Sequence, residues 1–223
     1  MFINKFKSIL SLAGEDTDAA IGTVDVKSLR DALGRPLDTE TLATLADLQR
    51  FYREADRIVK ECDQLMKRHV EQIRRKAKEA TPLSRRESML LRLTRMKSIG
   101  FRTAWLLVHE LFWKQFANVR GVGSASGLAA VPFSSGLTDK CAGISRRSNG
   151  RLRASLVELA WLWVRHQPGS ALTHWFRERT DAGISRRRMK KVAIVAVARK
   201  LAVALWKFLE RDEAIEGARL KTA

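Results

Sequence analysis

Cysteine and long apolar runs are two features that this sequence largely lacks. Its two cysteines, Cys62 and Cys141, stand far apart and form no Cys-x-x-Cys pair. This spacing indicates neither a disulfide framework nor a structural zinc site, and free thiols suit a reducing cytosol. The longest apolar run, VAIVAVA from Val192, is interrupted by Arg199 and Lys200 and is too short to span a bilayer. We therefore expect a cytoplasmic protein with no membrane partner.

Acidic residues are scarce in the C-terminal part, which limits the chemistry available there. Beyond residue 84 the carboxylates are dispersed, except for a group in the tail, so the clustered acids of a two-metal phosphate enzyme are missing. No Gly-x-Ser-x-Gly motif of an ordinary serine hydrolase occurs. GVGSASG at 121–127 has the wrong spacing for a dinucleotide fingerprint, and we interpret residues 120–127 as a loop. The sequence therefore predicts no metal site and no cofactor in this chain.

Positive charge is abundant and unevenly placed. The 223 residues carry a formal net charge of +18 and have a pI of about 10.8. Residues 1–83 contain 15 Lys and Arg against 14 Asp and Glu, whereas residues 84–223 contain 27 against 10. Such an excess indicates a polyanionic partner for the C-terminal part. The alternative is a basic surface that merely keeps the chain soluble.

Helical periodicity runs through most of the chain, and the alternation typical of strands is absent. The sequence therefore predicts an all-α fold, in which a long coiled-coil helix precedes a compact multi-helix domain with a helix-hairpin-helix-like element. We expect the six tryptophans to pack mainly in its core. The expected parts are an N-terminal helix and irregular linker at 1–40, a coiled-coil helix at 41–82, the domain at 83–209 and a tail at 210–223. The expected helices cover residues 2–12, 26–33 (weakly), 45–73, 84–97, 101–113, 151–165, 170–179 and 184–211.

A heptad repeat over residues 45–73 is the clearest pattern in the sequence. Apolar positions recur there at alternating steps of three and four residues, with charged residues between them. A stripe of this width buries too little surface for an isolated helix in water, so the helix needs a partner. The partner is either a second subunit or the chain's own helix at 2–12, and we expect a homo-oligomer. The stripe consists of Leu45, Leu48, Tyr52, Ala55, Val59, Cys62, Met66, His69 and Ile73.

Two helical segments meet at the turn Ser98-Ile99-Gly100. A helix, a short glycine-containing turn and a second helix resemble a helix-hairpin-helix, whose turn offers backbone N–H groups to a phosphate. Gly100, Arg102 and Thr103 are therefore candidate nucleic-acid-binding residues. An ordinary helix turn is the alternative.

The stretch GLAAVPFSSGLTDKCAGISRRSNGRLR at 127–153 places Ser134 and Ser135 in an expected exposed loop before a series of arginines. Guanidinium groups can bind a phosphodiester through paired hydrogen bonds, but a serine hydroxyl attacks phosphorus only when it is activated. Composition alone therefore favours plain nucleic-acid binding over covalent chemistry. The candidate phosphate-binding residues are Arg146, Arg147, Arg151 and Arg153, joined by Arg186, Arg187, Arg188, Lys190 and Lys191 near the start of the last helix.

Four sequence blocks in a fixed order resemble a known family. They are KSIGFRTAWLLVHELFW, GLAAVPFSSG, GISRRSNGRLRASLVELAWLWVRHQPGSALTHWFRER and KKVAIVAVARKLAVALW. Over residues 84–209 they resemble the C-terminal domain of transposases of the bacterial insertion-sequence family IS one-ten/one-sixteen, whose members are DEDD-plus-serine recombinases. The resemblance implies DNA cleavage and strand transfer in transposition, with Ser135 as the nucleophile and Ser134 as the alternative. It also implies DNA as partner, a guide RNA in some members, and a coiled coil that matches the heptad helix.

The sequence departs from the family pattern in three places. Pro132 does not directly follow the Gly-Leu-x triplet, and Ser98 stands where the family usually has glycine. More importantly, nothing corresponds to the ribonuclease-H-like domain whose four acids bind a divalent metal. The resemblance therefore implies a truncated transposase that does not recombine DNA alone, with the metal belonging to the missing domain and a full-length transposase as a possible partner. The alternatives are a non-catalytic nucleic-acid-binding coiled-coil protein that modulates a full-length transposase, and an unrelated helical scaffold.

Overall fold

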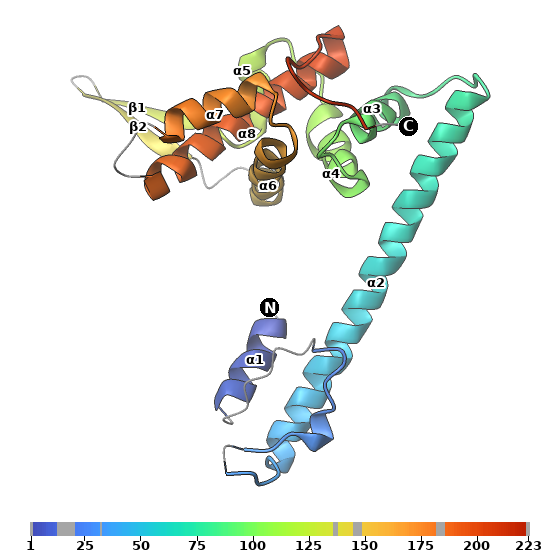
Figure 1. The fold of residues 1–223 in the computed structure, drawn as a ribbon, viewed down its shortest axis with the longest axis vertical. Coiled ribbons are helices and arrows are strands. Elements are labelled where there is room, and N and C mark those ends of the chain that lie inside the picture. The colour runs from blue at the N-terminus through green and yellow to red at the C-terminus, as the bar shows by residue number, and fades with distance from the viewer. Residues whose placement is uncertain are drawn as a thin grey trace. The chain divides into compact units, whose positions relative to one another are not determined.

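The computed structural model consists of two compact units, Met1–Leu65 and Met66–Ala223 (Figure 1). Helix α2, Thr39–Lys78, begins in the first unit and ends in the second. Helices dominate both units, which confirms the all-α class, and no helix in the described part has the length and hydropathy to cross a membrane. The structure describes residues 2–12, 21–31, 33–135, 138–144, 149–181 and 186–221.

The first unit is built around helix α1, Phe2–Leu12, and the first half of α2. Phe6 and Leu10, one helical turn apart on α1, are buried with Leu45 and Leu48 of α2 in one apolar cluster. The buried Gln49 side chain donates hydrogen bonds to the carbonyl oxygens of residues 21 and 24, at 2.8 and 2.6 Å. These contacts confirm the predicted helix at 2–12.

The expected weak helix at 26–33 is wrong, because only a single 3-10 turn, η1 at Val26–Ser28, forms there. Leu29 already has extended backbone angles, and Arg30 pairs with Pro36 in an isolated β-bridge. The Asp31 carboxylate accepts hydrogen bonds from the backbone N–H groups of residues 33 and 35, each at 2.9 Å. Such local side-chain bonding favours a turn over a helix.

Helix α2 confirms the helical reading of residues 45–73, but its apolar stripe is covered only at the ends. Leu45 and Leu48 are buried in the first unit, and Val70 and Ile73 are buried in the second. Between them, Val59 of the stripe and the flanking residues Phe51, Ile58 and Leu65 are each about half exposed, at 48–59%. The pairing of this central stretch with a second subunit stays a prediction.

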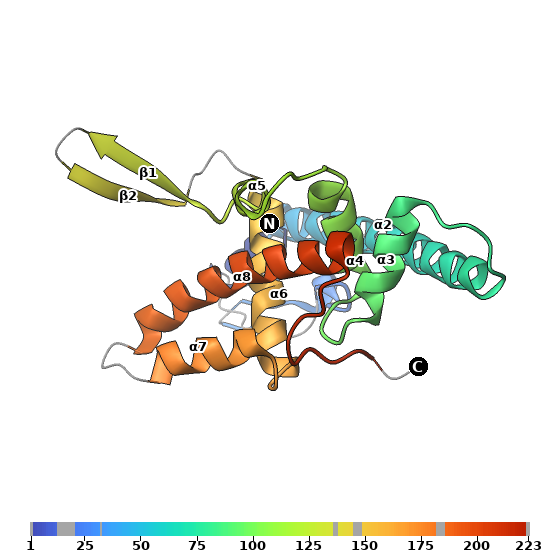
Figure 2. The same ribbon diagram turned by 90° about the horizontal axis from the view of Figure 1, so that it is seen from above.

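The second unit packs its helices around one core, with α8, Arg186–Arg211, at the centre. Helices α6, Gly150–His166, and α7, Ala171–Asp181, both lie against α8 (Figure 2). Val197, Leu201 and Leu205 of α8 are fully buried, as expected for a helix with apolar residues on most of its sides. The remaining helices of the described part are α3, Arg85–Arg95; α4, Phe101–Leu106; the π-helix η2, Leu107–Phe112; and α5, Val119–Ala125.

The expected loop at 120–127 is wrong, because most of it belongs to α5. The Asn118 side chain caps this helix by accepting a hydrogen bond from the Gly121 N–H at 3.0 Å. Gly123 is buried, and a Cβ atom there would lie 3.0 Å from Nε of Arg199 on α8. The small residues that suggested a loop therefore allow two helices to approach closely.

The expectation of a loop without strands around Ser134 and Ser135 is also wrong. Strands β1, Ala130–Ser135, and β2, Thr138–Ile144, pair antiparallel, with Ser134 opposite Asp139 and Ser135 opposite Thr138. The β-branched and aromatic residues Val131, Phe133 and Thr138 favour strands, and a two-stranded ribbon has only edge strands, which tolerate Pro132. The ribbon was missed because its runs are short and contain small residues.

Residues after α8 pack back onto the second unit. Leu220 forms a β-bridge with Met96, the Lys97 N–H donates to the Arg219 carbonyl at 3.1 Å, and the Lys221 N–H donates to the Arg95 carbonyl at 2.7 Å. This C-terminal strap, residues 213–221, is therefore part of the unit's structure.

Candidate nucleic-acid interface

The α3–α4 hairpin brings the predicted Gly100, Arg102 and Thr103 together at one helix end. The Ser84–Glu87 capping box fixes the start of α3, and Ile99 is fully buried in the turn. Gly100 is the N-cap of α4 and supplies no side-chain cap. Because the first N–H groups of a helix lack intrahelical acceptors, this end can donate hydrogen bonds to an anion.

The C-terminal strap is joined to the hairpin turn by hydrogen bonds. The Lys221 ammonium donates hydrogen bonds to the carbonyl oxygens of Thr94 and Ile99, both at 2.7 Å. Burial lowers the pKa of Lys221, and the positive charge of Arg74 lowers it further. The buried Gln167 side chain donates to the Lys97 carbonyl at 2.7 Å and accepts from the Arg219 N–H at 2.8 Å. The turn is thereby held in one conformation.

The two candidate serines lie at the end of β1, next to the turn of the ribbon. The backbone register places Ser134 beside Asp139, the acid nearest to the serines in sequence. Their side chains are not described, so the structure places their backbone only.

The predicted arginines divide into three groups. Arg146 and Arg147 lie outside the described residues. Arg151, in the first turn of α6, forms an ion pair with Glu110 of η2, and Asn149 donates to the same carboxylate at 2.7 Å. Arg153 lines a groove beside the start of α6. A phosphate that binds Arg151 must therefore compete with Glu110, a residue that sequence reasoning did not single out.

The start of α8 is unusually basic for the N-terminus of a helix. Its first six residues are Arg186, Arg187, Arg188, Met189, Lys190 and Lys191, with no acid in the first turn. Cations are unfavourable near a helix N-terminus, because the helix dipole and the free N–H groups there favour negative charge. Lys190 and Lys191 are exposed, while the side chains of the three arginines lie outside the described ones. A bound anion would relieve this repulsion.

An open groove of about 580 Å³ lies beside the base of β1 and the start of α6. Its lining is mainly apolar, with Arg153 and Glu158 as charged members and the half-exposed Trp161 at one side. The groove therefore adjoins the ends of the segment that contains the candidate serines and arginines, since Leu128 and Gly150 both line it.

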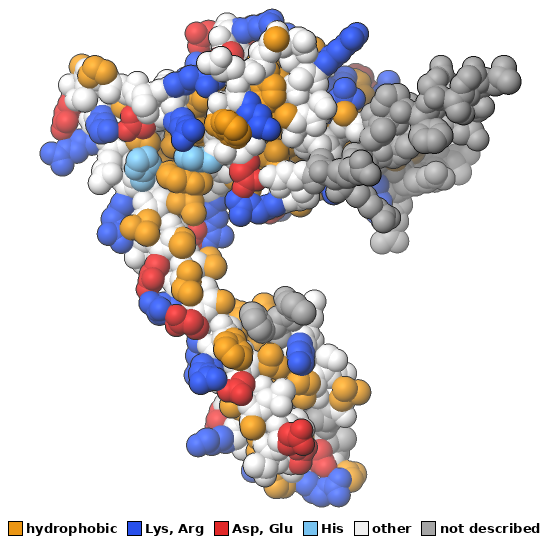
Figure 3. Space-filling model, turned by 180° about the vertical axis from the view of Figure 1, so that it is seen from behind, with side chains coloured by type: hydrophobic (Ala, Val, Ile, Leu, Met, Phe, Trp, Pro, Cys, Tyr) orange, Lys and Arg blue, Asp and Glu red, His pale blue; other side chains and the backbone are white. Residues whose placement is uncertain are grey.

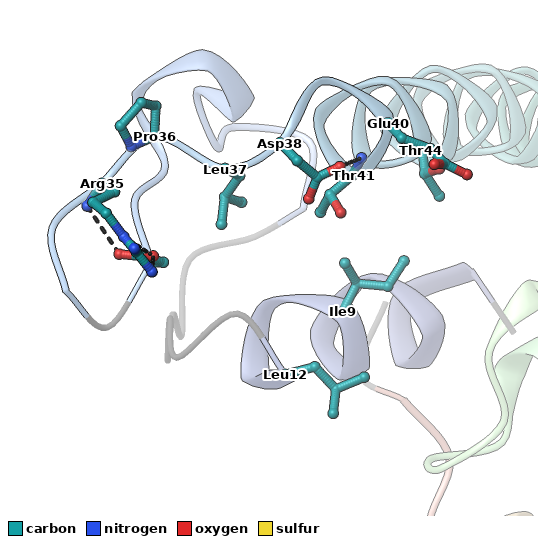
Figure 4. A pocket seen from close by; sticks show the side chains of 10 residues that line it. Ile9, Leu12, Arg35, Pro36, Leu37, Asp38, Glu40, Thr41 and Thr44 are labelled. Carbon is teal, nitrogen blue, oxygen red and sulfur yellow. Dashed lines mark hydrogen bonds and ion pairs between the residues drawn. The ribbon is translucent and has the colours of Figure 1, made fainter.

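A second hollow, of about 960 Å³, lies in the first unit between α1 and residues 31–44 (Figure 4). Asp31 pairs there with Arg35 at 2.8 Å, and Asp38 accepts a hydrogen bond from the Thr41 N–H at 2.8 Å. Hydrogen bonds from Arg35 and from Thr41 lower the pKa of Asp31 and of Asp38, respectively. A site with three acids and one paired arginine does not suit a polyanion.

The two structural units differ more in net charge than do the segments 1–83 and 84–223 that were compared in the sequence. Residues 1–65 contain 9 Lys and Arg against 12 Asp and Glu, a net charge of −3, whereas residues 66–223 contain 33 against 12, a net charge of +21. Figure 3 shows Lys and Arg side chains spread over the visible face of the second unit. Within the described residues, no group of three or more His, Cys, Asp or Glu could hold a metal ion.

Comparison with known proteins shows that this chain is similar to transposases. The model of the IS116/IS110/IS902 transposase family matches residues 90–175. "Putative transposase y4rJ" of Sinorhizobium fredii (strain NBRC 101917 / NGR234) is 39% identical over 206 residues, which cover 88% of this chain and 49% of that protein. The chain thus spans about half the length of this relative.

Proposed function

Because residues 90–175 match the model of the IS116/IS110/IS902 transposase family, we propose that the second unit of this chain binds DNA in transposition. The observation that carries this proposal is the net charge of +21 on residues 66–223, compared with a net charge of −3 on residues 1–65. Neutralising phosphates releases counterions from DNA, so a basic unit of this kind binds nucleic acid strongly at low salt. The amide groups at Gly100, Arg102 and Thr103 and the basic start of α8 are the proposed contacts with the sugar–phosphate strand.

Ser135 is the proposed nucleophile, with Ser134 as the alternative. In the proposed step a bond forms between Ser135 Oγ and the phosphorus, one bond from phosphorus to a sugar oxygen breaks, the serine proton leaves to a base and the released oxygen takes up a proton. Arg146, Arg147, Arg151 and Arg153 are proposed to hold the phosphate and to offset the charge on phosphorus. Arg151 would exchange its ion pair with Glu110 for the phosphate.

Strand cleavage in this proposal draws on a divalent metal held outside residues 1–223. The relative y4rJ is about twice as long as the matched region, which leaves room in that protein for a further domain. A metal-bearing domain of a complete transposase would supply the cation, and this chain alone would not cleave DNA.

The exposed stretch of α2 is the proposed contact with another subunit. Phe51, Ile58 and Leu65 recur every seven residues and are each about half exposed. Pairing of this stripe in a coiled coil would bury it, with a second copy or with a full-length transposase. A guide RNA is a further proposed partner of the basic unit.

The proposed nucleophile can be tested by trapping it on DNA. The chain would be combined with a complete transposase whose own serine is replaced by alanine, together with Mg²⁺ and a labelled insertion-sequence end. We expect protein covalently joined to DNA with the natural sequence and with Ser134→Ala, and none with Ser135→Ala. An adduct that persists in Ser135→Ala would refute the assignment.

A second function is favoured by the pairing of Arg151 with Glu110, which occupies one of the proposed phosphate-binding arginines. The chain would then bind nucleic acid without catalysis and modulate a full-length transposase through mixed coiled coils. Salt-dependent DNA binding without any adduct in the same assay would support this function. Absence of binding even at low salt would instead support a helical scaffold with no nucleic-acid role.

A further inference from the structure

Four aromatic side chains occupy every fourth position from the start of α4 to the residue that follows η2. This aromatic ladder consists of Phe101, Trp105, His109 and Trp113. Tryptophans at helical spacing were expected in the core, and Trp163 and Trp206 are indeed buried. Trp113, however, is 47% exposed, and the other three rings of the ladder are partly exposed. The ladder is therefore accessible at the surface of the second unit.

From helix geometry we expect the π-helix to keep these rings near one face. In an α-helix, four residues turn about 40° beyond a full turn, so a long ladder at this spacing would drift around the helix. The wider π-helix, with hydrogen bonds from i to i+5, falls short of a full turn in four residues and reverses that drift. The Trp105 and His109 rings are stacked, with centroids 4.3 Å apart and planes 19° apart. The His109 Nδ1–H donates to the Trp105 carbonyl at 2.9 Å, which fixes the ring orientation.

Cations lie at both ends of the ladder. The Lys67 ammonium lies 5.5 Å from the centre of the Phe101 ring, and the Lys114 ammonium lies 5.5 Å from the centre of the Trp113 ring. His69 contacts Trp105 edge-on at 5.4 Å, and Figure 3 shows two histidine side chains next to each other with Lys and Arg nearby.

The acid on the ladder's own segment is already paired. Glu110 is the one acid in the sequence between residues 97 and 120, and it is held by Arg151 and Asn149. The surface therefore combines partly exposed rings with a positive local charge.

We propose that the aromatic ladder stacks the unpaired bases of a single-stranded nucleic acid, whose phosphates lie along Lys67 and Lys114. Rings interleaved with cations suit this ligand, because every base has a π-face and the backbone is anionic. A duplex does not fit in the same way, since its bases already stack on one another. The ladder thus adds a single-strand site to the proposed nucleic-acid binding, on which this inference rests. Single-stranded DNA and RNA share the required chemistry.

The test compares the affinity of the full chain for labelled oligo(dT), oligo(U) and duplex DNA, each of about 20 nucleotides, which exceeds a typical single-strand site. Trp113→Ala removes the most exposed ring of the ladder. We expect about tenfold weaker binding of a single strand, from the usual contribution of one stacked base, and unchanged binding of the duplex. Trp113→Phe retains a ring and should bind nearly as the natural chain does. Val119→Ala is the control, because Val119 is 40% exposed on the same unit but lies outside the ladder and outside the groove beside α6.

Each outcome has a defined meaning. A loss restricted to oligo(U) or to oligo(dT) supports the ladder and identifies RNA or DNA as its ligand. The inference is overturned if Trp113→Ala binds both single strands normally, if it loses duplex binding equally, or if Val119→Ala shows the same loss. If the single-strand inference fails while the proposed function is correct, the natural chain still binds duplex DNA at low salt. If the natural chain binds none of the three probes, the proposed function fails as well.

Discussion

Ser98 combines two unfavourable features in the hairpin turn. Its φ angle of 85° lies in the left-handed region, where a side chain is strained, and its Oγ is buried with no hydrogen-bond partner. Glycine adopts this conformation without a side-chain penalty, which agrees with the resemblance that places glycine here. Ser98 therefore keeps a backbone conformation that serine disfavours. The burial of Ile99 and the hydrogen bond from Lys221 of the strap to the Ile99 carbonyl stabilise this conformation.

Ser98→Gly should raise the free energy of unfolding by about 1 kcal/mol, since relief of strain and of the unpaired hydroxyl exceeds the entropy cost of glycine. Urea denaturation followed by circular dichroism measures the change. Ser98→Ala is the control, because it removes the hydroxyl and keeps the strained angle, so its gain should be smaller. A less stable Ser98→Gly protein would contradict this account of the turn.

Glu87 links two elements, the end of α2 and the start of α3. Its carboxylate binds the Lys76 ammonium at 2.8 Å and accepts a hydrogen bond from the Ser84 N–H at 2.9 Å. The bond to Lys76, followed by the bonds to Ser84, lowers the pKa of Glu87 from 4.5 to about 2. Because the folded state holds the carboxylate in its charged form, this group stabilises the fold above pH 4.5.

Glu87→Gln should therefore lower the melting temperature at neutral pH, and the difference from the natural chain should vanish as the pH falls from about 4.5 through about 2. Melting curves recorded across this range provide the measurement. Glu79→Gln is a matched control, since Glu79 lies directly after the end of α2 and pairs with Arg75 of the last turn of that helix, at 3.0 Å. A difference that stays constant down to pH 2 would show that the charge of Glu87 has no such role.

The strap depends on one close approach of backbone to backbone. Gly217 has a φ of 66°, and a Cβ atom there would lie 1.9 Å from the carbonyl oxygen of Gly169. Real atoms cannot approach so closely, so any larger residue must push the strap away from the link between α6 and α7. The hydrogen bonds between Gln167 and Arg219 of the strap, and those from Lys221 to the hairpin, depend on this docking.

Gly217→Ala should lower the free energy of unfolding by about 2 kcal/mol through backbone strain and should make the strap sensitive to protease. Denaturation curves and limited trypsin digestion, which cleaves after the exposed Arg219 and Lys221, measure the two effects. Gly150→Ala is the control, because a Cβ atom there makes only an ordinary contact of 3.9 Å with Arg153. Equal protease resistance of the Gly217→Ala and natural proteins would exclude the strap from the stability of the unit.

Sequence patterns predicted the helices whose formation depends on neighbouring residues. They missed the elements whose formation depends on packing against distant parts of the chain. The periodicity of α1, α6, α7 and α8 and the Ser84 cap could be read from the sequence, since each depends on neighbours within a few residues. Helix α5 could not, because its buried Gly123 is explained only by the proximity of Arg199 on α8. The Arg151–Glu110 pair joins residues 41 positions apart, so the candidate site also contains contacts that no spacing rule predicts.

Across the whole molecule, charge assigns a separate role to each unit. The first unit has a net charge of −3 and half-exposed apolar positions on α2, which suit a protein partner. The second has a net charge of +21 and suits a nucleic acid. Helix α2 runs from the first unit into the second, so it can connect the proposed pairing of subunits to the proposed binding of nucleic acid. The division at residue 65 also explains why counting charge from residue 84 underestimated the contrast.

This separation predicts where phosphate contacts lie, and the salt dependence of DNA binding can measure it. Each phosphate contact that is lost should reduce the slope of log K against log salt by about 0.9. The double variant Lys190→Ala and Lys191→Ala, at the basic start of α8, should therefore bind duplex DNA more weakly and with a slope lower by about 1 to 2. The double variant Lys5→Ala and Lys7→Ala removes two exposed lysines from α1 and the same total charge. If the DNA contacts lie in the second unit, its slope stays that of the natural chain; equal losses in both variants would mean that net charge alone, and not the placement of these lysines, governs binding.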